Sequence, residues 1–171
     1  MLAVFVDLFK AFDRVWKEGL LLSCFKLMCL KSCTNGSRAI YSTEQQVKLD
    51  NTLSQQMKMR EGVSQGGVVS PTLFLVYING LVPSLPRCVS NTLHADDLAI
   101  WSSETSAGTA TFRIQTAINK VAEWTDKWAL SINKTKTVAV LFSLSTSKER
   151  IKLTQHGHHT STTSGNNNIS W

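Results

Sequence analysis

The 171-residue chain has few cysteines and prolines, an excess of basic over acidic residues, and no long apolar run. Its four cysteines fit neither the paired spacing of a structural zinc site nor a dense disulfide framework. Cys29 and Cys33 lie one helical turn apart and are interpreted as small apolar residues in a reducing compartment. The apolar stretch at 20–30 is interrupted by Ser23 and Lys26, which argues against a transmembrane span. The N-terminus has no basic segment of a signal peptide and carries the acidic Asp7, so an intracellular protein is expected.

The charge balance favours a polyanionic partner. Eighteen Lys and Arg residues against twelve Asp and Glu residues give a net charge of +6 and a pI near 9.3. Nucleic acid is favoured over a membrane surface as that partner, although many basic proteins bind neither. Hydrophobic residues make up 43% of the chain, a proportion typical of a globular protein with one sizeable core.

The beginning of the chain predicts a strand followed by a helix. The β-branched and aromatic run at 2–6 is typical of a buried strand, which ends on Asp7. Asp13 is interpreted as the N-cap of a helix that continues to about Leu30. Because a domain rarely begins with a central strand, further chain is expected upstream of Leu2.

The middle of the chain predicts a hairpin, a helix and a second hairpin. Residues 46–60 favour a hairpin with its turn near 50–51. Ser-Pro at 70–71 predicts a helix start, and the two prolines within 83–86 predict its end. Residues 91–101 favour two short strands around a tight turn.

The last third predicts a helix, a strand and a polar tail. Apolar residues at helical spacing indicate a helix over 108–128, and 137–144 has the composition of a final strand. Residues 145–171 are rich in Ser, Thr, His, Gly and Asn, and no packed structure is expected there. The order of elements predicts an α+β fold with helices packed on one face of a sheet. The change in composition predicts a folded core over 1–144 and a polar tail over 145–171.

Three aspartates are placed where a divalent cation would stabilise them. Asp7 ends an apolar strand, and Asp96 and Asp97 are adjacent in the predicted turn. Neighbouring carboxylates repel one another, and a divalent cation removes that cost. Two Mg²⁺ ions about 3.5–4 Å apart, held by such aspartates, would form a site for phosphoryl transfer. A polar hairpin turn and a strand-end cap remain the alternatives.

Residues 62–71 form a second unusual stretch, rich in glycine. Glycines allow a substrate or template to approach the backbone, and Gln65 offers both a donor and an acceptor. The helix start that follows favours an anion. Any glycine-rich turn before a capped helix has this pattern, so the pattern alone is not specific.

Four motifs together carry a resemblance to a known family. They are residues 5–13, residues 62–71, Ala-Asp-Asp-Leu at 95–98 and Leu-Ser-Ile-Asn-Lys-Thr-Lys-Thr at 130–137. Their order and spacing resemble the reverse transcriptases of non-LTR (LINE-like, jockey-like) retrotransposons. The resemblance implies a polymerase palm with a mixed or antiparallel sheet, and with fingers and thumb largely missing. Telomerase-like and group II intron enzymes are alternatives within the polymerase class.

The resemblance also implies roles for individual residues. Asp7, Asp96 and Asp97 match the catalytic, metal-binding aspartates, and the carbonyl of Leu8 matches a further metal ligand. Lys136 matches a lysine that protonates the leaving pyrophosphate, although a solvated lysine at a strand end has the same appearance.

Three residues match the nucleotide site of the family. Phe12 corresponds to the aromatic residue that excludes a 2′-hydroxyl, with core packing as the alternative. Gln65 and Gly66 correspond to residues lining the incoming nucleotide and template. His94 departs from the family by replacing an aromatic residue, and it is expected to fill the same packing position.

The implied reaction is template-directed nucleotidyl transfer by an RNA-directed DNA polymerase. Its cofactors would be two Mg²⁺ ions, with Mn²⁺ as a substitute. Its partners would be an RNA template, a DNA primer and dNTPs, with no membrane. Without fingers and thumb, the isolated chain is expected to be inactive. The alternative is a non-catalytic nucleic-acid-binding remnant that uses basic residues such as Lys48, Lys58 and Arg60. The oligomeric state is not predicted.

Overall fold

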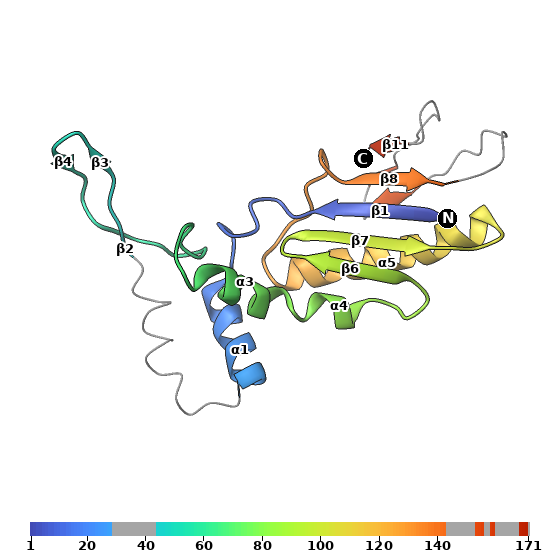
Figure 1. Ribbon diagram of the computed structural model, residues 1–171, viewed down its shortest axis with the longest axis horizontal. Helices are drawn as coiled ribbons and strands as arrows, with labels where there is room; N and C mark the ends of the chain where they lie inside the picture. The colour runs from blue at the N-terminus through green and yellow to red at the C-terminus, as the bar shows by residue number, and fades with distance from the viewer. Residues whose placement is uncertain (29–43, 143–152, 156–157, 160–167, 171) are drawn as a thin grey trace. The chain divides into compact units, whose positions relative to one another are not determined.

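The computed structural model describes residues 1–28, 44–142, 153–155, 158–159 and 168–170 (Figure 1). The chain divides into two compact units, one comprising Met1–Phe9 with Asn79–Trp171 and the other Lys10–Ile78. Cys29 and Cys33 lie outside the described residues. No helix in the described part of the chain is long and apolar enough to cross a membrane.

A five-stranded antiparallel sheet forms the centre of the first unit. Its strand order is β11-β8-β1-β7-β6, which places β1 between β8 and β7 (Figure 1). The strands are β1 (Leu2–Asp7), β6 (Ser90–His94), β7 (Asp97–Ser102), β8 (Val138–Leu141) and β11 (Asn168–Ser170). The strand predicted at the start of the chain and the two predicted within 91–101 are therefore confirmed, and the predicted final strand is shorter than expected.

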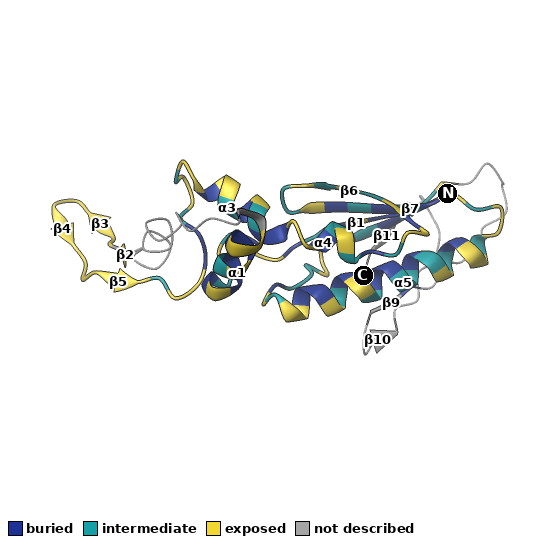
Figure 2. Ribbon diagram, turned by 90° about the horizontal axis from the view of Figure 1, so that it is seen from below, coloured by how far each residue is buried: buried dark blue, intermediate teal, exposed yellow. Residues whose placement is uncertain are grey.

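One face of this sheet is covered by α5 (Ala107–Lys127), which packs against β1 and β7 (Figure 2). Side chains alternate between the two faces of a strand, and Leu2, Val4 and Val6 of β1 are all buried. Burial of each such side chain contributes about 1.5–3 kcal/mol. The intervening positions of β1, including the 48%-exposed Phe5, point to the other face of the sheet. Asp7 is two residues after Phe5 and therefore lies on that same face. The predicted helix over 108–128 is confirmed.

The helix predicted from 70–71 is shorter than expected. It ends at Ile78 as α3 (Ser70–Ile78), and a separate short helix follows as α4 (Leu81–Ser84). Pro83 lies inside the first turn of α4 and so does not terminate the earlier helix. Proline is tolerated there because the first N–H groups of a helix have no intrahelical acceptor.

The described residues of the second unit form two helices and short paired strands. The helix α1 (Lys17–Met28) packs against α3. The strands β2 (Glu44–Gln45) and β5 (Met57–Lys58) pair, and β3 (Lys48–Leu49) pairs with β4 (Thr52–Leu53). The turn between β3 and β4 is residues 50–51, as predicted, and Asp50 has a φ of 52°, which aspartate tolerates better than most residues.

Asp13 is not the N-cap of the first helix, so that prediction is wrong. The helix begins at Lys17, and the backbone N–H groups of Asp13 and Arg14 donate to the carbonyl of Lys10 at 3.0 and 3.1 Å. This turn satisfies the local backbone before the helix starts. The Asp13 side chain is therefore available for a partner elsewhere in the unit.

The residues described beyond 144 include three short strands. The strand β9 (Thr154–Gln155) pairs with β10 (His158–His159), and β11 adds to the central sheet beside β8. Leu153 is buried. The expectation of no packed structure does not hold for these described residues, and the domain boundary at 144 stays a prediction.

Candidate active site

Asp7 and Asp97 face each other across two neighbouring strands. The antiparallel register of β1 and β7 places Asp7, the last residue of β1, directly opposite Asp97, the first residue of β7. Directly opposed residues have Cβ atoms about 4.5–5.5 Å apart, and like charges there are destabilising. The pairing therefore concentrates negative charge at this end of the sheet.

Asp96 lies in the tight turn that joins β6 to β7. Because His94 pairs with Asp97, only Ala95 and Asp96 form the loop, and Ala95 has a φ of 53°. Two-residue hairpin loops require a positive φ, a conformation that costs a non-glycine residue about 1–2 kcal/mol. The tight turn predicted from the sequence is confirmed. His94 is exposed, so the packing role expected for it is wrong.

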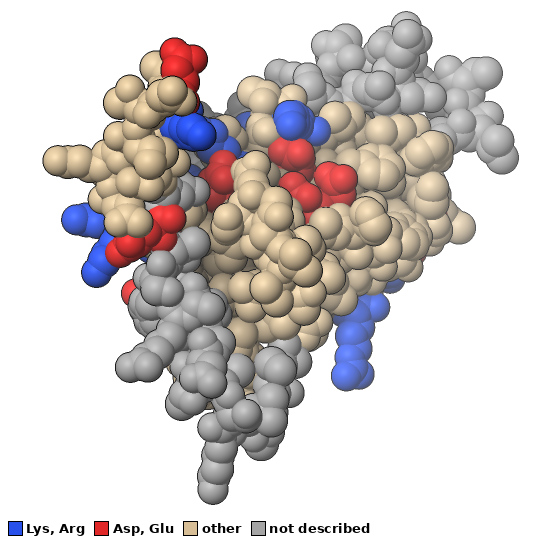
Figure 3. Space-filling model, turned by 60° about the vertical axis from the view of Figure 1, so that its left-hand side comes forward, with Lys and Arg blue, Asp and Glu red and all other residues tan. Residues whose placement is uncertain are grey.

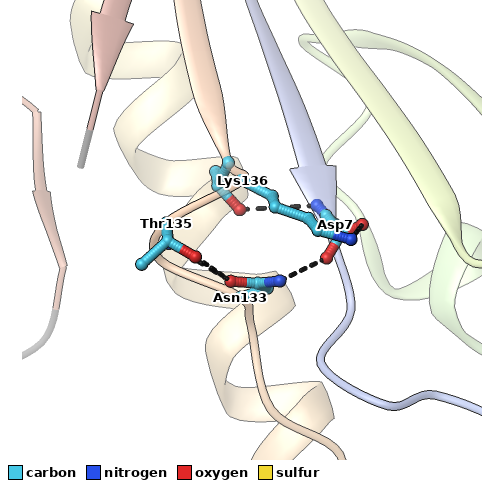
Figure 4. Close-up of polar contacts among 5 residues, drawn as sticks. Asp7, Asn133, Thr135 and Lys136 are labelled. Carbon is cyan, nitrogen blue, oxygen red and sulfur yellow. Dashed lines mark hydrogen bonds and ion pairs between the residues drawn. The ribbon is translucent and has the colours of Figure 1, made fainter.

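The carboxylate of Asp7 has a partner on each oxygen (Figure 4). The Asn133 side-chain Nδ2–H donates to Oδ2 at 2.8 Å, and the Lys136 Nζ lies 3.9 Å from Oδ1. On the face drawn in Figure 3, acidic side chains gather next to a basic one, in keeping with these contacts. Lys136, singled out by the resemblance, is thus brought to Asp7.

The segment at 130–137 reaches Asp7 because it runs along the end of β1. The backbone N–H of Phe9 donates to the Ser131 carbonyl, and the N–H of Asn133 donates to the Asp7 carbonyl, both at 2.8 Å. Leu8, which is buried, forms an isolated bridge with Ile132. The predicted role of the Leu8 carbonyl as a metal ligand stays a prediction.

The two contacts to Asp7 differ in strength. The Lys136 side chain is 70% exposed, so its ion pair is worth about 0–1 kcal/mol. A hydrogen bond to a charged group is worth about 1.5–3 kcal/mol, and the Asp7 side chain is only 23% exposed. Asn133 is therefore the stronger partner of Asp7, and the sequence analysis did not single it out.

The aspartates offer the donor chemistry that Mg²⁺ requires. Carboxylate oxygens are hard ligands of the kind that magnesium selects. Within the described residues, however, no three His, Cys, Asp or Glu side chains form a group that could hold a metal ion together. The carboxylates of these aspartates are suitable ligands for Mg²⁺, and the strand register brings Asp7 and Asp97 together. The three carboxylates of Asp7, Asp96 and Asp97 do not form one cluster.

Phe12, in the second unit, packs against another aromatic residue. Its ring stacks on that of Phe74, with centroids 4.3 Å apart and planes inclined by 19°. Phe12 is half-buried, whereas Phe74 is fully buried. The stack agrees with the core-packing alternative, and the sugar-selecting role of Phe12 stays a prediction.

The glycine-rich loop is held by a side-chain hydrogen bond. Gln65 donates through Nε2 to Oδ1 of Asp13 at 2.7 Å. Gly62 has a φ of +85°, and a Cβ there would lie 2.8 Å from the Asp13 carbonyl oxygen. Gly66 has a φ of +84° and open space around it. Asp13 is thus a partner of Gln65, a pairing that no local sequence signal indicates.

Comparison with known proteins identifies the family. The family described as reverse transcriptase (RNA-dependent DNA polymerase) matches residues 1–163. The chain belongs to this family. It is 33% identical over 156 residues to the probable RNA-directed DNA polymerase from transposon BS of Drosophila melanogaster, covering 84% of this chain and 17% of that protein. It is 30% identical over 151 residues to the RNA-directed DNA polymerase from mobile element jockey of Drosophila funebris, covering 81% of this chain and 16% of that protein.

The recognition of a jockey-like reverse transcriptase from its motifs is confirmed by these relatives. The chain spans less than a fifth of the length of the two relatives described above. The activity of these complete proteins can therefore only be proposed for this chain.

Solved structures confirm the fold. Apo telomerase from Candida tropicalis, truncated from its C-terminal domain, superposes with a TM-score of 0.65 at 15% identity, covering 94% of this chain and 34% of that one. Telomerase from Candida albicans in complex with a fragment of telomeric RNA gives a TM-score of 0.59 at 14% identity, covering 95% of this chain and 29% of that one. At such identity the likeness concerns the fold alone. The predicted α+β palm with an antiparallel sheet is confirmed.

Proposed function

We propose that this chain supplies the palm of an RNA-directed DNA polymerase of the non-LTR retrotransposon type. The main support for the proposal is the strand register that places Asp7 directly opposite Asp97. Lys136 lies beside Asp7, and the chain belongs to the reverse transcriptase family. In the reaction, a primer 3′-hydroxyl attacks the α-phosphate of a dNTP. A new phosphodiester bond forms, and the bond to pyrophosphate breaks.

The proposed metal ligands are the carboxylates of Asp7, Asp96 and Asp97 with the carbonyl of Leu8. Two bound Mg²⁺ ions, or Mn²⁺ in their place, would activate the attacking hydroxyl and stabilise the charge on the leaving pyrophosphate. The repulsion between the opposed carboxylates of Asp7 and Asp97 supports the assignment, because a cation between them would relieve it.

Lys136 is the proposed proton donor to the leaving pyrophosphate. Its ammonium lies beside Asp7 at the end of an exposed, flexible side chain, so it can reach a phosphate oxygen. Protonation of that oxygen stabilises the leaving group as the bond to the α-phosphorus breaks.

The second unit is proposed to contribute nucleotide selection. The ring of Phe12 would exclude the 2′-hydroxyl of a ribonucleotide, and Gln65 and Gly66 would line the nucleotide and template. The exposed Gln65 side chain, restrained by Asp13, and the open space around Gly66 support this assignment. The proposed polymer partners are an RNA template and a DNA primer, which the net charge of +6 favours.

The test combines metal binding with primer extension. Mn²⁺ binding by the purified chain is measured by electron paramagnetic resonance, and Asp7→Asn and Asp96→Asn should abolish it. Extension is measured in the jockey polymerase with its matching segment replaced by the aligned part of this chain, and Asp96→Asn should abolish extension there. The chain alone is expected not to extend a primer. Salt-sensitive RNA binding without Mn²⁺ binding and without extension by the chimera would instead support the non-catalytic remnant.

A further inference from the structure

Asn133 makes polar contacts through both ends of its side-chain amide (Figure 4). Its Nδ2–H donates to Oδ2 of Asp7 at 2.8 Å. Its Oδ1 accepts from the backbone N–H of Thr135 at 3.2 Å and from the Thr135 hydroxyl at 2.8 Å. One side chain thus connects the predicted catalytic carboxylate to the turn at 133–137.

The backbone of Asn133 reinforces the same connection. Its N–H donates to the Asp7 carbonyl at 2.8 Å, and its own carbonyl accepts from the N–H of Lys136 at 3.3 Å and of Thr137 at 3.0 Å. Asn133 therefore holds the turn that carries Lys136 against the end of β1, together with the Thr137 hydroxyl, which accepts from the Asp7 N–H at 3.4 Å. A displacement of Asn133 would move Asp7 and Lys136 relative to each other.

The hydrogen bond from Asn133 also distinguishes the two oxygens of Asp7. The terminal torsion of an aspartate is broad and roughly two-fold, so an unrestrained carboxylate rotates readily. Asn133 engages Oδ2 with a donor that cannot coordinate a cation. Among the described residues, the other oxygen, Oδ1, has only the long contact of 3.9 Å to the exposed Lys136, which an incoming cation can replace.

We propose that Asn133 is a positioning residue for nucleotidyl transfer. By holding Oδ2 of Asp7, it presents Oδ1 to the metal ion, and through the same amide it orders the turn that carries Lys136. The inference rests on the proposed function. Hydrogen-bonding partners that orient a metal-binding carboxylate typically change metal affinity by about 10–100-fold when they are lost.

A purely local role for Asn133 makes a different prediction. Asn commonly stabilises a turn by accepting hydrogen bonds from residues two positions on, and this uses only Oδ1. Serine can supply the same acceptor but is too short to replace the Nδ2 donor to Asp7. Asn133→Ser thus separates the two roles, and Thr135→Val weakens the turn while leaving the contact to Asp7 in place.

The experiment measures Mn²⁺ affinity and the thermal midpoint on the purified 171-residue chain. Asn133→Ser should weaken Mn²⁺ binding about tenfold or more, whereas Thr135→Val should change it by less than about twofold. Both variants should lower the midpoint, and Asn133→Ser should lower it further, because only that variant loses a hydrogen bond to a charged group. Asn133→Thr provides a second variant of the same chemistry if the serine variant does not fold, as judged by circular dichroism.

Two results would overturn the inference while leaving the proposed function intact. One is Mn²⁺ binding by Asn133→Ser within about twofold of the wild type, and the other is an equal loss of affinity in Thr135→Val. Asp7→Asn, measured alongside, reports on the proposed function. If the wild type and Asp7→Asn bind Mn²⁺ equally, the proposed metal site is wrong and the role of Asn133 is refuted with it.

Discussion

Gln65 donates a hydrogen bond to the carboxylate of Asp13 at 2.7 Å, although the two residues are 52 positions apart. The bond joins the glycine-rich loop to the segment that follows β1. Gly62 makes this approach possible, because a Cβ there would lie 2.8 Å from the Asp13 carbonyl oxygen. Two of the four motifs that carry the family resemblance are thereby in direct contact within the second unit.

The coupling between Gln65 and Asp13 is measurable by a double-mutant cycle. Gln65→Ala and Asp13→Ala should each lower the free energy of unfolding, and the double variant should lose less than the sum. A coupling of about 1 kcal/mol is expected, since both side chains are exposed and the acceptor is charged. Urea unfolding measures it, with the exposed Gln55→Ala as control. Strict additivity would show that the bond has no energetic role.

Asp97→Asn should stabilise the protein when no divalent cation is present. The change removes a like charge placed directly opposite Asp7. The free energy of unfolding should rise by some tenths of a kcal/mol up to about 1 kcal/mol. Added Mg²⁺ or Mn²⁺ should then raise the thermal midpoint of the wild type more than that of the variant. Differential scanning fluorimetry with and without the cation provides the measurement.

The control for this experiment is Asp126→Asn, on an exposed position of α5. It removes the same formal charge from the same unit without touching the pairing of β1 and β7. An equal gain in both variants would mean that net charge, and not the opposed carboxylates, sets the effect.

Phe12 is expected to affect both stability and sugar selection. Phe12→Ala removes a stacked ring, worth about 0.5–1.5 kcal/mol beyond its buried area, and should lower the free energy of unfolding. In the jockey chimera it should raise ribonucleotide relative to deoxyribonucleotide incorporation. Phe74→Leu disrupts the same stack and serves as the control, because its position is fully buried. Unchanged selection in Phe12→Ala would leave Phe12 with a packing role alone.

The elements that could be predicted from the sequence are those that local patterns specify. The β-branched and aromatic run in β1 and the helical periodicity along α5 are properties of neighbouring residues, and both elements form where the patterns place them. The turn at 50–51 likewise depends on local backbone preferences. Family membership could also be recognised, since four ordered motifs together are far more specific than any one of them.

The contacts that build the site could not be predicted in the same way. The register between Asp7 and Asp97 depends on strands that are distant in the sequence, and the bond between Asn133 and Asp7 spans 126 positions. Asn133 lies inside a recognised motif, but an asparagine near a turn is ordinarily explained by the turn alone. The contact of the Asn133 side chain with Asp7 is visible only in the folded structure.

Tyr77→Phe should destabilise the second unit by about 1–2 kcal/mol at neutral pH. The fully buried Tyr77 hydroxyl accepts a hydrogen bond from the Trp16 backbone N–H at 3.2 Å, and phenylalanine would leave that N–H without this acceptor. Burial raises the pKa of Tyr77 above its ordinary value of 10.0. Above about pH 10, Tyr77 therefore ionises in the unfolded chain before it ionises in the folded chain, and the free energy of unfolding of the wild type falls. The difference in stability between the wild type and Tyr77→Phe should become smaller there. Urea unfolding across this pH range tests both effects.

Lys17 should give the opposite pH dependence. Burial lowers its pKa below the ordinary value of 10.5, an effect that the neighbouring Glu18 partly offsets, and its amine donates to the carbonyl of Met59. Between the lowered pKa and 10.5, the unfolded chain binds more protons than the folded chain, so the free energy of unfolding rises with pH. Lys17→Met should lose this rise, whereas Lys26→Met, at an exposed position of α1, should retain it. Parallel slopes for the wild type and Lys17→Met in the alkaline range below pH 10.5 would show that burial of Lys17 does not govern alkaline stability.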